Sequence, residues 1–110
     1  MAAAPPPSDE AAALLEQVLN PLLRDFEESF SRGLKLLDHC PEQVLAAAAR
    51  QTLRERLEQG LAGLAAARML RQAAPAPMAL EMATIQPWHQ LVVEVWSLSA
   101  AMRAAGVVVA

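Results

Sequence analysis

The chain has few of the residues that form β-sheets and few that carry out chemistry. It contains no Tyr, a single Ile, two Trp, two Phe, two His and one Cys among 110 residues. Because β-branched and aromatic side chains favour strands, their scarcity argues against a sandwich, a barrel or a βαβ unit. One cysteine cannot form an internal disulfide, and this fits a reducing cytoplasmic setting.

Signals of membrane insertion, nucleic-acid binding and cofactor binding are also missing. No apolar run reaches the roughly 20 residues of a membrane-spanning helix, and the N-terminus has no secretory signal pattern. The net charge of −3 provides no broad basic surface, and no aromatic residues alternate with the arginines, so nucleic acid is not an expected partner. No glycine-rich phosphate loop and no paired-carboxylate motif is present. We therefore expect no catalytic residues, no cofactor and no enzyme activity.

The chain is rich in helix-forming residues. Its 24 Ala and 17 Leu make up over a third of the sequence, and both favour helix. We predict an all-α fold, in which two long antiparallel helices form a hairpin and a shorter third helix folds back over its open end, giving a three-helix bundle. The domain spans 9–106, after a Pro/Ala-rich lead at 1–8 that we expect to be disordered and before an apolar tail at 107–110.

The first helix is predicted over 9–39, where apolar residues repeat every three or four positions. Pro21 lies inside this pattern and costs on the order of 3 kcal/mol, because it removes a hydrogen bond and clashes with the preceding turn. The helix therefore either kinks at Pro21 or divides there into two helices. The apolar spacing continues on one side of the helix across the proline, through Leu19, Leu22 and Phe26. This continuity favours a kink over a division into two helices.

The second helix is predicted over 41–72, because a proline at position 41 suits the first turn of a helix. It contains Gly60 and Gly63 in a stretch of small residues. Either these glycines reflect neutral drift in an Ala-rich chain, or another helix approaches closely at this point. The third helix is predicted over 86–105, beginning near Pro87 and ending at Gly106 as its C-cap.

Charge is divided unequally between the first two helices. The first is mainly acidic, whereas the second carries five arginines, at positions 50, 54, 56, 68 and 71. The simplest interpretation is a set of solvated faces with cross-helix ion pairs, each worth about 0–1 kcal/mol. The alternative is an arginine-rich face that binds an acidic partner.

The residues capable of metal or thiol chemistry are His39, Cys40 and His89. A zinc site needs at least three protein ligands, so all three side chains would have to meet. His39 and Cys40 lie at the joint of the first two helices, whereas His89 opens the third helix near the other end of the hairpin. We therefore expect neither a metal site nor a thiol–base pair. A reactive thiol at Cys40 remains an alternative, because the start of the helix that follows it can lower the pKa of a thiol.

Both tryptophans lie in the third helix, eight residues apart and so about 80° apart around its axis. Apolar residues cover a wider part of the circumference of this helix than a small bundle needs for its core. The extra apolar surface is either part of the core or is closed by a second copy or another protein. The candidate contact residues are Trp88, His89, Leu91, Trp96, Phe26 and Phe30.

The segment Pro87-Trp88-His89-Gln90-Leu91-Val92, followed by Glu94 and Trp96, resembles the C-terminal signature of a small cyanobacterial family, a domain of unknown function. The segment from Pro21 to Leu37 resembles the same family. The resemblance implies a cyanobacterial protein, cytoplasmic or bound peripherally to an internal membrane, with no established enzymatic activity. It also implies that the region of Trp88 and His89 matters beyond packing.

Three functional hypotheses follow. The leading one is a non-catalytic helical protein-interaction module that self-associates or docks through the third helix and the adjoining face of the first. The second is a peripheral thylakoid or photosynthetic-complex accessory protein that uses the third helix and the apolar tail. The third is a thiol- or His-dependent activity using Cys40 or His89, which would require an oligomer to bring distant residues together.

Overall fold

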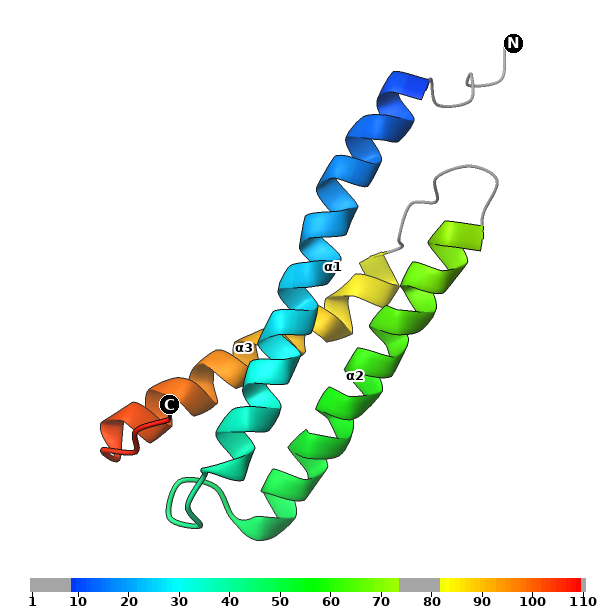
Figure 1. The fold of residues 1–110 in the computed structure, drawn as a ribbon. Helices are drawn as coiled ribbons and strands as arrows, with labels where there is room; N and C mark the ends of the chain where they lie inside the picture. Colours follow the sequence, from blue (N-terminus) through cyan, green and yellow to red (C-terminus); the bar gives the residue numbers. More distant parts are fainter. Residues whose placement is uncertain (1–8, 74–81, 110) are drawn as a thin grey trace.

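The long helical hairpin organises the structure. The computed structural model describes residues 9–73 and 82–109, and within these ranges it contains three helices and no strand: α1 (Asp9–Asp38), α2 (Ala47–Ala73) and α3 (Met82–Ala104). α1 and α2 run antiparallel, and α3 crosses the hairpin at an angle (Figure 1). The predicted all-α three-helix bundle is confirmed. The lead at 1–8 lies outside the described residues. None of the described helices is long and apolar enough to cross a membrane.

α1 is one continuous helix that passes through Pro21. The alternative of two separate helices divided at this residue is therefore wrong, and the kink remains a prediction. Pro21 is exposed, so its ring does not compete for space in the core. Because proline has no N–H, the carbonyl of Gln17 loses its partner in the helix at this point.

α2 begins at Ala47, so the predicted start at Pro41 is wrong by six residues. The carbonyl of Pro41 accepts hydrogen bonds from the backbone N–H groups of Val44 (3.0 Å) and Leu45 (3.2 Å), which forms a turn. Val44 and Leu45 pack against the core. Burial of these two side chains requires the chain to cross the end of the hairpin before it becomes helical. Arg50 fixes this connection by donating to the carbonyl of Cys40 at 2.9 Å.

α3 begins earlier than predicted, because Pro87 lies inside the helix whose first described residue is Met82. Pro87 is exposed, so the helix loses one hydrogen bond without bringing the ring into the core. The C-terminal end agrees with the prediction. Gly106 has a φ of 78°, and Gly106 and Val107 donate to the carbonyls of Arg103 (3.0 Å) and Met102 (2.9 Å). This is a Schellman motif.

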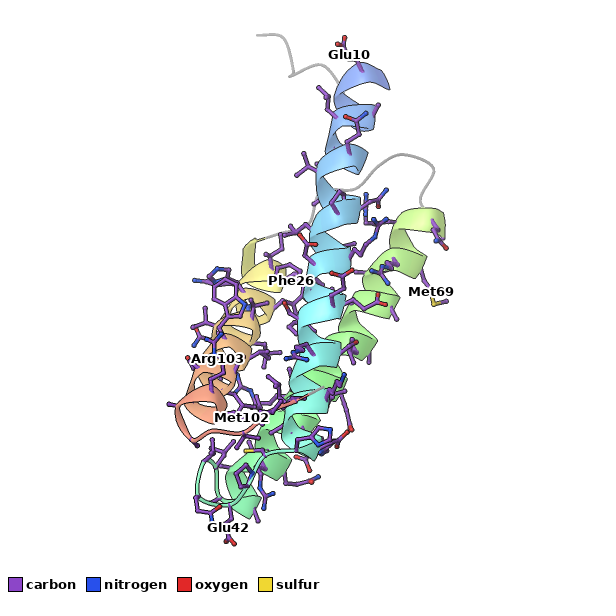
Figure 2. All side chains as sticks on the ribbon, turned by 60° about the vertical axis from the view of Figure 1, so that its left-hand side comes forward. Glu10, Phe26, Glu42, Met69, Met102 and Arg103 are labelled. Carbon is purple, nitrogen blue, oxygen red and sulfur yellow. The ribbon has the colours of Figure 1, made fainter. Side chains whose placement is uncertain are left out.

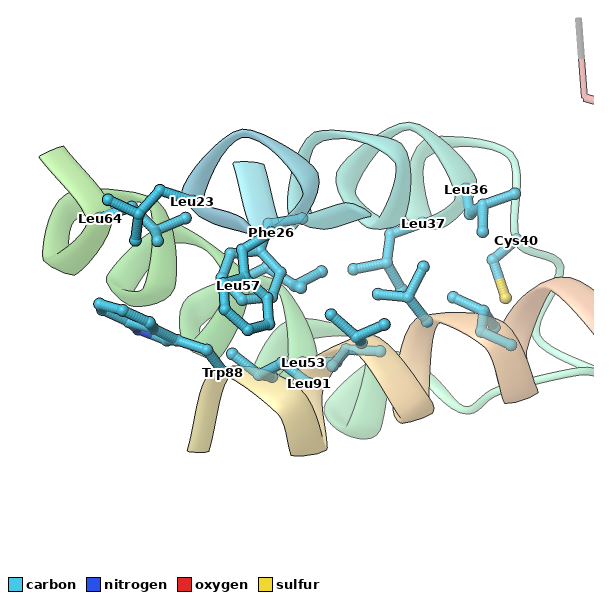
Figure 3. Packing of buried hydrophobic residues seen from close by; sticks show 14 of the residues in the cluster. Leu23, Phe26, Leu36, Leu37, Cys40, Leu53, Leu57, Leu64, Trp88 and Leu91 are labelled. Carbon is cyan, nitrogen blue, oxygen red and sulfur yellow. The ribbon is translucent and has the colours of Figure 1, made fainter. Parts of the chain in front are cut away.

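α3 packs on the hairpin from the level of Phe26 to the α1–α2 connection, where Leu98 lies beside Val44, so the expectation that it folds over the open end is wrong. The first part of α3 packs against α1 through Trp88, whose ring centroid lies 5.8 Å from that of Phe26. Its end shares a cavity with Leu36 near the end of α1. α1 extends past both other helices, as far as Glu10 (Figure 2). Apart from Leu19, the buried apolar side chains of the described residues form one cluster between the three helices (Figure 3).

Two glycines allow this close packing. A Cβ atom at Gly33 of α1 would lie 2.7 Å from Cγ2 of Val95 and 2.9 Å from Cδ1 of Leu57. A Cβ atom at Gly60 of α2 would lie 2.8 Å from Cε2 of Phe30, which is fully buried. The interpretation that another helix approaches closely at Gly60 is therefore confirmed. The equally close approach at Gly33 was not predicted from the sequence.

Ion pairs join α2 to both neighbours, which confirms the cross-helix interpretation of the charges. Arg54 and Arg68 pair with Asp38 and Glu27 of α1, and Arg56 pairs with Glu94 of α3. Arg71 donates to Asn20 at 2.9 Å. All of these side chains are partly exposed or exposed, so each pair is worth about 0–1 kcal/mol.

The glycines predict stability effects of opposite sign within one helix. Gly60→Ala should destabilise the protein by about 1–2 kcal/mol, because the new methyl group meets the buried ring of Phe30. Gly63→Ala should stabilise it by up to about 1 kcal/mol, because the nearest neighbouring atom is 3.5 Å away and alanine is the better helix former. Urea unfolding measures both changes. Equal effects at the two positions would contradict the packing described here.

Candidate interaction face

The structure separates the six predicted contact residues into two groups. Four lie in the core and are at most 7% exposed: Phe26, Phe30, Trp88 and Leu91. The other two, His89 and Trp96, are exposed. The prediction of a contact surface is therefore wrong for these four residues, because they are buried within a single chain.

The two tryptophans have different environments. The ring of Trp88 lies against Phe26 with an interplanar angle of 57°, and only 7% of the residue is exposed. Trp96 is 63% exposed. The difference follows from helix geometry: Val95 packs against Gly33, and the next residue in a helix points about 100° away.

Trp96 is the centre of an exposed stripe along α3. His89 lies seven residues before it and Arg103 seven residues after it, so all three share one side of the helix. All three are exposed. This side of α3 borders α1, because Arg103 lines a cavity of about 290 Å³ together with Arg32 of α1.

A matching stripe runs along the adjoining side of α1. Val18, Asp25 and Arg32 are also spaced by seven residues and are exposed. The six residues of the two stripes are called the α1/α3 face below. Asp25 precedes Phe26 and so lies near the start of α3, whereas Arg103 lies at the end of α3. The face therefore carries an acidic group toward one end, basic groups toward the other, and an indole between them.

Sequence reasoning identified only Trp96 and His89 of this face. The repeated spacing of seven residues was the signal that could have revealed the others. Spacing alone, however, does not show which side of α1 borders α3. That assignment depends on the packing of Gly33 against Val95.

The side chains considered for thiol or metal chemistry lie apart. Cys40 is 5% exposed, and its sulfur lies 3.6 Å from the carbonyl oxygen of Pro41. His39 is exposed. His89 lies near the start of α3, at the level of Phe26. Phe26 precedes Cys40 by 14 residues, which corresponds to roughly 20 Å along the axis of α1. Among the described residues, no three His, Cys, Asp or Glu side chains come together as metal ligands.

The ion pair between Arg56 and Glu94 joins α2 to α3. Arg56 Nη1 donates to Glu94 Oε1 at 2.8 Å. This hydrogen bond raises the pKa of the Arg56 guanidinium above its usual value; burial opposes the rise, and charge attraction adds to it. The pair stabilises the crossing of α2 and α3 beside the apolar contact of Gly60 with Leu91.

These features define a small helical bundle with a mixed polar and aromatic face along α1 and α3. The chain belongs to the protein family DUF2605, described as a protein of unknown function, which it matches over residues 9–104. The resemblance to a domain of unknown function is thereby confirmed. Searches of the curated proteins and of the solved structures give no match.

The different environments of the indoles predict different responses to substitution. Trp88→Ala should destabilise the protein by about 3–5 kcal/mol, because it empties a buried site between α1 and α3. Trp96→Ala should change the free energy of unfolding by at most about 0.5 kcal/mol at a concentration where the protein is monomeric. Thermal unfolding of both variants measures the difference. A large loss for Trp96→Ala in the monomer would show that its indole is part of the core.

Proposed function

We propose that the protein is a non-catalytic interaction module that self-associates through the α1/α3 face. The observation that carries this proposal is the exposure of Trp96, which leaves 63% of the residue in water. Tryptophan is among the residues that most often dominate the energy of protein interfaces, because a buried indole contributes a large apolar area with few rotatable bonds.

The distribution of charge on the face supports a second copy of this chain as its partner. A symmetric dimer requires a surface that complements itself. Asp25 lies toward one end of the face, and Arg103 lies toward the other. When two copies pack antiparallel, the acidic end of each meets the basic end of its partner, and the two Trp96 side chains lie near the middle.

The two other hypotheses receive less support. Membrane association would use the apolar tail, but Val107 and Val109 pack against the core, which leaves Val108, 90% exposed, as the highly exposed residue among the described tail positions 107–109. A thiol activity would need an accessible Cys40, which is buried. A cytoplasmic location in a cyanobacterium-like source accompanies the proposal as an implication of the resemblance given above.

Light scattering over a hundredfold concentration range tests self-association. The wild type should change from monomer to dimer, and Trp96→Ala should weaken the dimer by at least about 30-fold, which corresponds to the loss of an interface residue worth about 2 kcal/mol. The matched control is Met69→Ala, because Met69 is 69% exposed and points away from the bundle on α2 (Figure 2). This control should leave the dimer unchanged.

A charge swap tests the arrangement of the two copies. Asp25→Arg should weaken the dimer by about fivefold at low salt, because it makes both ends of the face basic. Combining Asp25→Arg with Arg103→Asp should restore part of the affinity, because position 25 again meets an opposite charge at position 103 of the other copy, whereas Arg32 keeps one like charge at that end of the face. A wild type that stays monomeric throughout, or a dimer unaffected by Trp96→Ala, would contradict the proposal.

A further inference from the structure

A cleft of about 650 Å³ lies between α1 and α2 near the open end of the hairpin, beyond the part that α3 covers. Among the residues that the structure describes, those lining the cleft are all polar and come from α1 and α2: Asn20, Arg24, Glu27, Arg68, Arg71 and Gln72. Its volume is within the range of about 300–1,000 Å³ that is usual for small-molecule sites. We propose that this cleft binds an anionic ligand through a phosphate group.

The lining is mainly basic in a protein whose net charge is −3. Of the described residues, three arginines and one glutamate line the cleft. Guanidinium groups present several N–H donors in one plane, and this arrangement matches the oxygens of a phosphate group. The chemistry of the lining therefore selects a multivalent oxyanion and not an apolar ligand.

Two of the arginines provide the binding groups without rearrangement of the helices. Arg68 is oriented by its ion pair with Glu27, which uses only one of its nitrogens and leaves other N–H donors for a ligand. Arg24 is exposed, and no carboxylate among the described residues pairs with it. An anion between Arg24 and Arg68 would join α1 to α2, next to the hydrogen bond from Arg71 to Asn20.

This site is independent of the proposed dimer. The α1/α3 face contains neither Arg24 nor Arg68, and the cleft contains neither Trp96 nor Asp25. Loss of self-association would therefore leave anion binding intact, and loss of anion binding would leave self-association intact.

Titration with inorganic pyrophosphate in about 0.1 M salt, followed by NMR chemical shifts, tests the proposal. The wild type should bind one pyrophosphate saturably, with a Kd of about 1 mM or below, and the largest shifts should fall at the cleft. Arg24→Gln should weaken binding at least fivefold. The matched control is Lys35→Gln, because Lys35 is also an exposed basic residue of α1 but lies outside both the cleft and the α1/α3 face, and this variant should change the Kd by less than twofold.

Two results would overturn the proposal. One is the absence of saturation up to 10 mM pyrophosphate, and the other is an equal loss in Arg24→Gln and Lys35→Gln, which would indicate only general attraction to positive charge. A second arm identifies the source of the phosphate. If vesicles containing phosphatidylglycerol bind the wild type and compete with pyrophosphate, the ligand is a lipid headgroup, and if they do not, it is a soluble phosphate compound.

Discussion

The arrangement of the three helices depends on two missing side chains. Gly33 and Gly60 let Val95, Leu57 and Phe30 occupy space that a Cβ atom would fill. Because these contacts come from all three helices, they fix where α3 crosses the hairpin and how it is rotated. The same rotation sets the position of Trp96: with Val95 directed into the contact with Gly33, Trp96 lies about 100° further around the helix and is 63% exposed.

Helix content and most helix ends could be predicted from the sequence, because they depend on local preferences. The repeat of apolar residues in α1 and the left-handed backbone of Gly106 act over a few residues. The starts of α2 and α3 could not be predicted from their prolines. Pro41 suits a helix start, but the burial of Val44 and Leu45 outweighs that preference, and Pro87 is tolerated because its ring is exposed.

The candidate site was harder to predict than the fold. Periodicity gives the angle between Trp88 and Trp96 but not which of them faces the core, because that depends on the side chains of other helices. The same limit applies to Asp25 and Arg32, whose position beside α3 depends on the contact of Gly33 with Val95. The arginines of α2 were more predictable, since opposite charges on neighbouring helices of a small bundle lie within reach of each other.

The position of Pro21 has a consequence for the way the molecule opens. Before Leu19, none of the described side chains of α1 is buried, so the first turns of this helix receive little stabilisation from packing. The missing hydrogen bond at Pro21 separates these turns from the part of α1 held by the core. Their amides should therefore exchange with solvent through a local opening of low free energy, whereas amides after Phe26 exchange only when the whole bundle unfolds. In this sense α1 consists of two thermodynamic units within one continuous helix.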